Sequence, residues 1–157
     1  MSVPFEISAA TDEDVVHLEQ LLPELADFDV PERRDPRDLW AGDLALAREV
    51  IAGERTDAFC EVARSSDDGA VLATILVSVR KDLLSGAPSA HLEAIAVSPR
   101  ARGGGLGAQM LERAEQVARD AGAESLSLHV FGRNERARSL YAKFGYDEEL
   151  IRCVKWL

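Results

Sequence analysis

Glu93 is the residue whose place in the sequence points most directly to proton transfer. It stands in the mostly apolar run 91–97, and strict alternation along a strand puts it on the same face as Ile95 and Val97. Burial raises the pKa of a carboxyl group and makes the carboxylate a better proton acceptor near neutral pH. The alternatives are a glutamate at a strand end that reaches solvent, and His129 as a rival base.

Tyr141 is the matching candidate for a proton donor. It follows Asn134 by seven residues, which is two helical turns, so both side chains project toward a similar side. A tyrosine can bury its ring and leave its hydroxyl free. The same side chain also fits an apolar helical stripe with Leu140 and Phe144, so a purely structural role is the alternative. Asn134 is in addition a suitable N-cap for that helix.

A glycine-rich turn at residues 102–107 is suited to hold an anionic group. Glycines let consecutive backbone N–H groups converge on one point, and a helix that begins there adds the positive end of its dipole. Arg100 and Arg102 add formal positive charge. No Gly-Lys-Ser/Thr follows the turn, so it is not a nucleotide P-loop. The turn predicts a phosphate or pyrophosphate site, and a flexible soluble loop is the alternative.

Hydrophobic periodicity and turn residues predict the elements that must position these groups. Strands are expected at residues 3–9, 58–64, 70–81, 91–97, 125–131 and 148–157. Helices are expected after Thr11 with a break near Pro23, after Asp35, at residues 105–121 and after Asn134. The order β-α-α-β-β-β-α-β-α-β indicates an α/β (α+β layered) fold around a mixed sheet flanked by helices.

Two motifs resemble those of the GCN5-related N-acetyltransferase (GNAT) superfamily. The pattern Arg102-x-x-Gly105-x-Gly107 after the run 95–99 is similar to the family's acyl-CoA-binding motif, Arg/Gln-x-x-Gly-x-Gly/Ala. Residues 134–146 resemble its downstream motif, which usually ends in Gly-Phe or Gly-Tyr. The element order agrees over nearly the whole chain, although many members finish with two strands where one segment fits here. The resemblance implies a single domain over residues 1–157 with a mostly antiparallel sheet.

The resemblance also implies an activity and a set of site residues. Members move an acetyl group from acetyl-CoA to a primary amine, by direct attack in a ternary complex. Relatives carry at Glu93 a glutamate that accepts the amine's proton, and at Tyr141 a tyrosine that protonates the thiolate. A non-catalytic acyl-CoA-binding or regulatory domain and the transfer of a longer acyl chain are the alternatives. The implied coenzyme-binding residues are Ile95, Ala96, Val97, Arg102, Gly103, Gly104, Gly105, Leu106, Gly107, Ala108 and Asn134.

Charge is distributed unevenly along the chain, and this bears on the acceptor. Residues 1–50 hold 13 acidic and 4 basic residues, a net of −9 within a total of −10. The first two helices border the acceptor cleft in this family, so the acids there predict a cationic acceptor. An acidic surface that only keeps the protein soluble is the alternative. The acids form two clusters, Asp27, Asp29 and Glu32, and Asp35, Asp38 and Asp43.

Composition argues against several other classes of protein. A chain of 157 residues that is 46% hydrophobic and 29% charged is typical of one globular domain. A sequence pI near 4.8 argues against nucleic-acid binding. The longest apolar run, 70–79, is far shorter than the roughly 20 residues of a membrane helix, and no secretory signal is evident. Cys60 and Cys153 make no metal or redox spacing. We therefore expect a cytoplasmic protein without a metal, and the resemblance implies a small-molecule or peptide amine as the acceptor and a possible homodimer.

Overall fold

The strands and helices follow the predicted order as far as the last helix. The structure is a computed structural model that describes residues 3–157. The strands are β1 (Phe5–Ala9), β2 (Ala58–Ser65), β3 (Val71–Lys81), β4 (Pro88–Val97) and β5 (Leu126–Leu128). The α-helices are α1 (Val15–Leu21), α2 (Ala41–Ile51), α3 (Leu106–Asp120) and α4 (Glu135–Lys143). The 3-10 helices are η1 (Asp12–Asp14), η2 (Leu22–Ala26), η3 (Pro36–Leu39) and η4 (Pro99–Ala101).

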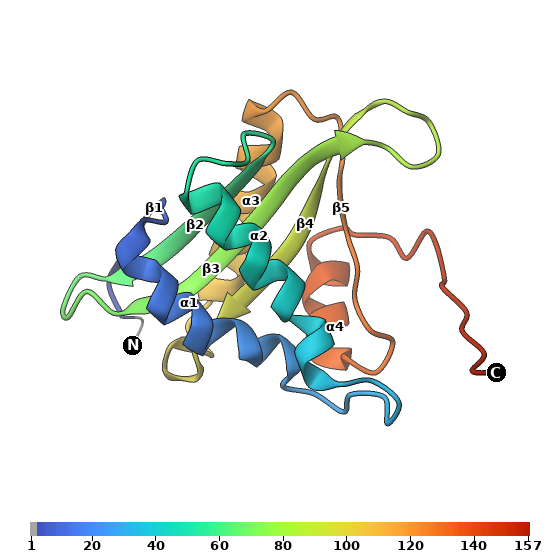
Figure 1. Ribbon diagram of the computed structural model, residues 1–157, viewed down its shortest axis with the longest axis horizontal. Coiled ribbons are helices and arrows are strands. Elements are labelled where there is room, and N and C mark those ends of the chain that lie inside the picture. The colour runs from blue at the N-terminus through green and yellow to red at the C-terminus, as the bar shows by residue number, and fades with distance from the viewer. Residues whose placement is uncertain (1–2) are drawn as a thin grey trace.

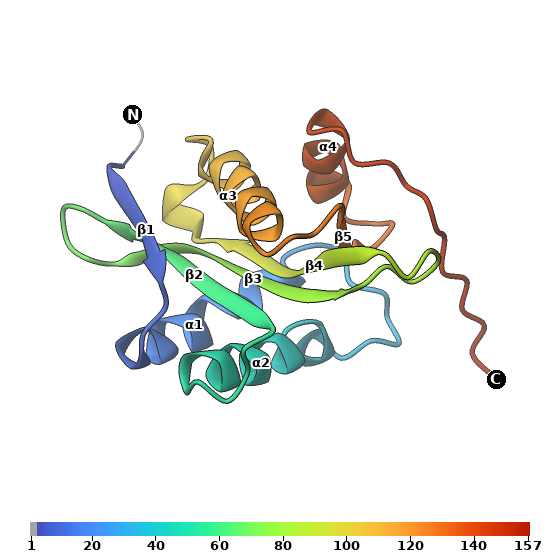
Figure 2. The same ribbon diagram turned by 90° about the horizontal axis from the view of Figure 1, so that it is seen from above.

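The strands form one sheet in the order β1-β2-β3-β4-β5, with helices on both faces. The first three pairings are antiparallel and the β4–β5 pairing is parallel. Helices α1 and α2 cover one face, and α3 and α4 cover the other (Figures 1 and 2). The predicted mixed, mostly antiparallel layered fold is confirmed. Among the described residues, no helix combines the length and apolar character needed to cross a bilayer.

Helix starts and breaks follow from local residue types. Pro23 lies at the start of η2, where the predicted break in the first helix occurs. The Asp35 side chain accepts a hydrogen bond of 2.9 Å from the backbone N–H of Arg37. The Asn134 side chain accepts one of 3.3 Å from the backbone N–H of Ala137. Both residues are therefore the N-caps that the sequence predicts.

Two separate cores attach the helix pairs to the sheet. Met110 and Leu111 of α3 are fully buried against β3 and β4 on one face. Leu18 and Leu22 are buried against the opposite face, together with Leu44 of α2. Because each pair of helices is fixed to the sheet by its own core, both faces of β4 are held in place beside the cleft described below.

Strand β4 is irregular at its centre and parts from β5 at the same point. Leu76 is paired with Ala94 but Val77 with Leu92, so Glu93 is the extra residue of a β-bulge. The parallel pairing with β5 ends at Leu92. From Glu93 onward, the β5 side of β4 has no strand partner among residues 3–157.

The predicted strand at residues 148–157 is wrong, and the one predicted at 125–131 is shorter than expected. Residues 147–157 have no regular structure and lead away from the body of the molecule (Figures 1 and 2). A strand is stable only when its backbone groups are paired with a neighbour. The neighbouring edge is β5, whose three residues offer few such groups. Several apolar side chains of this segment, Leu150, Ile151, Val154, Trp156 and Leu157, are therefore exposed.

Candidate active site

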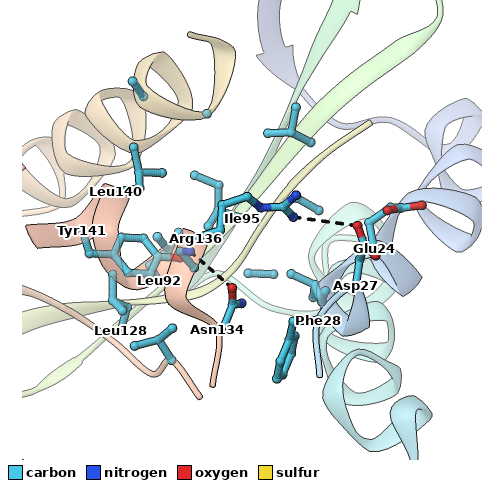
Figure 3. A pocket seen from close by; sticks show the side chains of 18 of the residues that line it. Glu24, Asp27, Phe28, Leu92, Ile95, Leu128, Asn134, Arg136, Leu140 and Tyr141 are labelled. Carbon is cyan, nitrogen blue, oxygen red and sulfur yellow. Dashed lines mark hydrogen bonds and ion pairs between the residues drawn. The ribbon is translucent and has the colours of Figure 1, made fainter. Parts of the chain in front are cut away.

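A cleft of about 520 Å³ opens where β4 and β5 part. Its walls come from β4, the turn before α3, helix α4, and the end of η2 with the residues that follow it. Figure 3 shows Leu140 and Tyr141 of α4 on one side, and Asp27 and Phe28 on the other. The cleft is thus lined by segments that are far apart in the sequence, and it is apolar at its centre with charged groups toward η2.

The glycine-rich turn forms one end of this cleft. Gly103 and Gly105 both have a φ of +81°, in the left-handed region that side chains with a Cβ rarely adopt. Within residues 3–157, the backbone N–H groups of Gly103, Gly104 and Gly105 donate no hydrogen bond to the backbone or to side chains. Helix α3 begins directly afterwards, at Leu106. Free N–H groups at the start of a 15-residue helix match the requirements of a pyrophosphate.

Gly107 lies between two walls of the cleft. A Cβ added at this position would lie 3.8 Å from Cγ2 of Val97 and 3.9 Å from Cδ2 of Leu140. Both neighbours line the cleft, one on β4 and one on α4. A Cβ at position 107 would therefore lie in ordinary van der Waals contact with both neighbours, and glycine leaves that space unfilled.

Arg102, the motif's arginine, is bound to acids of the η2 region. Its Nη1 lies 2.7 Å from Oδ2 of Asp27, and its Nη2 lies 2.8 Å from Oε2 of Glu24. Arg136 also lies 3.9 Å from Asp27, and Asp29 pairs with an arginine of the segment before α4. Part of the negative charge of residues 1–50 is therefore neutralised by arginines from later in the chain. The positive charge of Arg102, predicted at the turn, is likewise paired with these acids.

Glu93 faces α2, so the prediction that it shares a face with Ile95 and Val97 is wrong. The bulge at Glu93 breaks the alternation, and Ile95 and Val97 pack toward α3 and α4. Oε1 of Glu93 accepts hydrogen bonds of 2.5 Å from Oγ of Ser78 and from Nη2 of Arg80. Ser78 and Arg80 were missed by sequence reasoning, although their spacing of two residues on a predicted strand places them on one face.

Asp43 of α2 lines the same cleft as Glu93. Within residues 3–157 its carboxyl group makes no hydrogen bond or ion pair of its own. Burial raises the pKa of Asp43 to about 7, and the negative charge of Glu93 adds to the effect. Four carboxyl groups thus line the cleft, those of Glu24, Asp27, Asp43 and Glu93, and among residues 3–157 that of Asp43 is the one without a cation as its partner.

Tyr141 and Asn134 both reach the cleft from α4 and its N-cap. Tyr141 is 9% exposed, and its ring centroid lies 5.9 Å from that of Tyr146. Burial raises the pKa of the Tyr141 phenol, so its hydroxyl keeps its proton at neutral pH. Its ring packs in the core and the residue also lines the cleft, so its position allows both the structural role and the proton-donor role that the sequence left open.

Two histidines lie beside the carboxylates. Nδ1 of His91 lies 2.8 Å from Oγ of Ser127, and its ring centroid lies 4.6 Å from that of His129. Burial, with a smaller contribution from Arg80, lowers the pKa of His91 to about 4 and keeps the ring neutral at physiological pH. His129 follows the end of β5 and lines the cleft with Glu93.

The cleft brings together the residues that the resemblance implied, with one exception. Gly104 lies in an adjoining pocket with Gly103, Arg100 and Arg102. Arg100 is held by Asp68, away from the cleft. The residues of the implied set that line the cleft are Glu93, Ile95, Ala96, Val97, Arg102, Gly103, Gly105, Leu106, Gly107, Ala108, Asn134 and Tyr141.

Comparison with known sequences finds similar proteins. A mycothiol acetyltransferase of Beutenbergia cavernae is 37% identical over 86 residues, which cover 55% of this chain but 27% of that relative's length. A protein of Oryza sativa subsp. japonica, named "Probable glucosamine 6-phosphate N-acetyltransferase 2", is 31% identical over 120 residues. That match covers 74% of this chain and 70% of the relative. The chain thus spans about a quarter of the first relative and most of the second.

The fold is also found among solved structures. AAC(6')-Iy in complex with a bisubstrate analog superimposes with a TM-score of 0.72, over 98% of this chain and 99% of that chain. The sequence identity is 19%, so this likeness concerns the fold alone. The sequence itself matches the model of the Acetyltransferase (GNAT) family over residues 18–146, from α1 to the residue after Gly145. Because this match spans most of the chain and both motifs, the chain belongs to the Acetyltransferase (GNAT) family.

Proposed function

We propose that this protein transfers an acetyl group from acetyl-CoA to a primary amine of a cationic acceptor, by direct attack in a ternary complex. The observation that carries the proposal is the single cleft that runs from the glycine-rich turn, past Tyr141, to Glu93. The residues that we propose as pyrophosphate site, proton donor and proton acceptor all line this one cleft, which supports the proposal. These are the groups that the reaction needs at the coenzyme, the thiol and the amine.

The chain's own groups suit each part of the coenzyme. The N–H groups of the turn would bind the pyrophosphate, and the space beside Gly107 would take the pantetheine arm. The backbone of Ile95 and Val97, which has no strand partner on the β5 side, would hold the arm and the acetyl carbonyl. When bound, acetyl-CoA supplies the thioester carbonyl that an amine attacks. The bisubstrate complex of AAC(6')-Iy, a protein of the same fold, supports this use of the cleft.

Glu93 and Tyr141 would move the protons. An ammonium group must lose a proton before its nitrogen can attack, and Glu93 is the carboxylate at the α2 end of the cleft. As the nitrogen–carbon bond forms and the carbon–sulfur bond breaks, the Tyr141 hydroxyl would donate its proton to the departing thiolate. Because the pKa of Tyr141 is raised, its hydroxyl stays protonated and able to donate. General acid and base groups of this kind contribute about 10²–10⁴-fold to a rate.

The charge around the acceptor end of the cleft supports a cationic acceptor. Glu24 and Asp27 share the single guanidinium group of Arg102, Glu93 is paired with Arg80, and Asp43 adds a further negative charge when it is ionised. A cleft with surplus negative charge concentrates cations and speeds their capture. We expect an amine with further positive charge nearby to be a better acceptor than an acidic peptide or an amino-acid carboxylate.

Release of the coenzyme A thiol from acetyl-CoA, measured over a panel of cationic, neutral and anionic amines, tests this function. The KM of the best cationic amine should rise with salt, because the Debye length falls from about 10 Å at 0.1 M to about 3 Å at 1 M. A best substrate that is neutral or anionic, with a salt-independent KM, would contradict the acceptor class. Coenzyme binding without thiol release from any amine would indicate a non-catalytic acyl-CoA-binding domain.

We further propose that the protein forms a homodimer and works in the cytoplasm. The exposed apolar side chains of Leu150, Ile151 and Trp156 support the first proposal. Exposed apolar patches mark interaction surfaces, and most soluble oligomers are built from copies of one chain. The free thiols of Cys60 and Cys153 are compatible with the second.

A further inference from the structure

Asp43 is placed to act on the same amine as Glu93. It lies on α2 one turn before Ala47, a residue buried against the sheet, so its side chain points toward the strands. Glu93 reaches the same cleft from β4, in the facing layer. An amine that enters between α2 and β4 therefore has a carboxyl group on each side.

The two carboxyl groups differ in their surroundings. Glu93 has an oxygen that already accepts hydrogen bonds from Ser78 and Arg80. Asp43 has no such partner among residues 3–157, and it is partly buried beside the charge of Glu93. Burial beside a like charge raises the pKa of Asp43 to about 7, so this carboxyl group gains and loses a proton near neutral pH.

Several titratable and charged groups surround Asp43. From the sheet these groups are Glu93 and His91 of β4, Arg80 of β3, and His129 after β5. His91, with its pKa lowered to about 4, stays neutral, and Arg80 is paired with Glu93. From η2 and the residue after it, Glu24 and Asp27 are paired with Arg102. His129 lines the same cleft and is therefore tested by its own variant below.

We propose that Asp43 and Glu93 act together as the proton acceptor for the amine, with Asp43 as the carboxylate that keeps the proton. The inference rests on the proposed function.

Glu93, oriented by Ser78 and Arg80, would hold the ammonium beside the coenzyme. One N–H proton passes to Asp43, and the nitrogen's lone pair forms the bond to the acetyl carbon. The thiolate leaves with a proton from Tyr141, Tyr141 regains a proton from the new amide nitrogen, and Asp43 releases its own to solvent. The balance is one ammonium and acetyl-CoA consumed, and one amide, one thiol and one solvent proton formed.

The dependence of kcat/KM on pH tests the proposal, with the best amine of the panel as the acceptor. In the wild type, kcat/KM should fall below about pH 7, because protonated Asp43 cannot accept a proton. Asp43→Asn should lower kcat/KM at pH 7 at least about tenfold, and the fall near pH 7 should disappear. Asp43→Glu should restore part of the rate together with a pH dependence. Glu93→Gln should shift the residual pH dependence of Asp43 to lower pH, because it removes a neighbouring negative charge.

Two control variants separate the outcomes. Asp38→Asn makes the same change of charge on an exposed residue of η3, and it should leave the pH profile unchanged. His129→Asn removes the histidine that lines the same cleft and should also leave the fall near pH 7 in place. If that fall survives Asp43→Asn or is lost in His129→Asn, the assignment of Asp43 is overturned. Acetyl-CoA affinity equal to that of the wild type shows that each variant is folded. A wild-type protein that releases no thiol with any amine would instead contradict the proposed function itself.

Discussion

The guanidinium group of Arg102 joins the glycine-rich turn to Asp27, across 75 positions of the sequence and at 2.7 Å in space. Glu24 binds the other nitrogen of the same group at 2.8 Å. The arginine at the coenzyme turn is therefore attached to the segment that borders the acceptor end of the cleft. A change at either end of the cleft that moves Arg102 also affects the other end.

Asp27→Asn should tighten the binding of coenzyme A. Arg102 must weaken its contact with Asp27 in order to meet a phosphate, and pairs of this exposure are worth about 0–1 kcal/mol, or up to roughly fivefold in affinity. Isothermal calorimetry at low salt measures the change. Asp29→Asn is the matched control, because Asp29 pairs with Arg133 on the exposed surface. Weaker binding in Asp27→Asn alone would mean that Asp27 orients Arg102 rather than competing for it.

Gly105→Asp should weaken acetyl-CoA binding by about 100-fold or more, which corresponds to roughly 2.7 kcal/mol. The substitution adds a negative charge and strains the backbone where a pyrophosphate would bind. Gly122→Asp is the control, because Gly122 has a similar φ of +85° just beyond the other end of α3. It introduces comparable strain and the same charge far from the turn. Equal affinity in the two variants would remove the turn from coenzyme binding.

Tyr141→Phe should lower kcat by about 10²–10⁴-fold with little change in coenzyme affinity, because the proton is needed only as the thiolate leaves. Steady-state kinetics and calorimetry together measure the two effects. The raised pKa of Tyr141 means that the donor form persists to a pH above the ordinary phenol value of 10.0. Tyr146→Phe removes a hydroxyl that lies 3.4 Å from Glu115, so it should keep the wild-type rate. A wild-type rate in Tyr141→Phe would leave Tyr141 as a core residue.

The stability of the fold should depend on pH through Asp43. Its pKa is raised from 3.8 to about 7 on folding, so the folded state holds a proton that the unfolded state has lost between these values. Wild-type stability relative to Asp43→Asn should therefore fall as pH rises from 4 to 7, and level off above 7. After discounting for partial exposure, we expect about 1–3 kcal/mol in urea unfolding. A difference that is constant with pH would contradict the raised pKa.

Replacing Leu150 and Ile151 by aspartate should abolish dimer formation without loss of coenzyme binding. Charged groups at these exposed positions disrupt an apolar interface and touch no part of the cleft. Light scattering after size-exclusion chromatography measures the mass. The same substitutions at Leu83 and Leu84, which are exposed in the loop between β3 and β4, are the control. A wild-type protein that is monomeric at all concentrations would contradict the homodimer.

Much of the fold was predictable because its determinants are local in the sequence. The break at Pro23, the caps at Asp35 and Asn134, and the amphipathic helix that begins after Gly105 depend on residues within a few positions of one another. The glycine turn was predictable for the same reason, since the left-handed φ of Gly105 is a property of that residue and its neighbours.

The missed features depend on which strand lies beside which. A strand at residues 148–157 needs a neighbouring strand that pairs with its backbone, and the three residues of β5 are too few for this. The apolar residues of 148–157 therefore do not form a strand. The face on which Glu93 lies depends on the bulge between Leu92 and Ala94, which arises from the pairing with β3 and leaves no mark in the alternation of residue types.

The sequence by itself determined the order of elements, the anion-binding turn and the two motifs of the family, because each of these is encoded in contiguous residues. Only the tertiary structure decided which charges meet. It brought Arg80 to Glu93, Asp27 to Arg102, and Asp43 to the carboxylate of the facing layer. The reason is physical: charge neutralisation and burial depend on distances between side chains from different layers, and these distances follow from packing rather than from spacing along the chain.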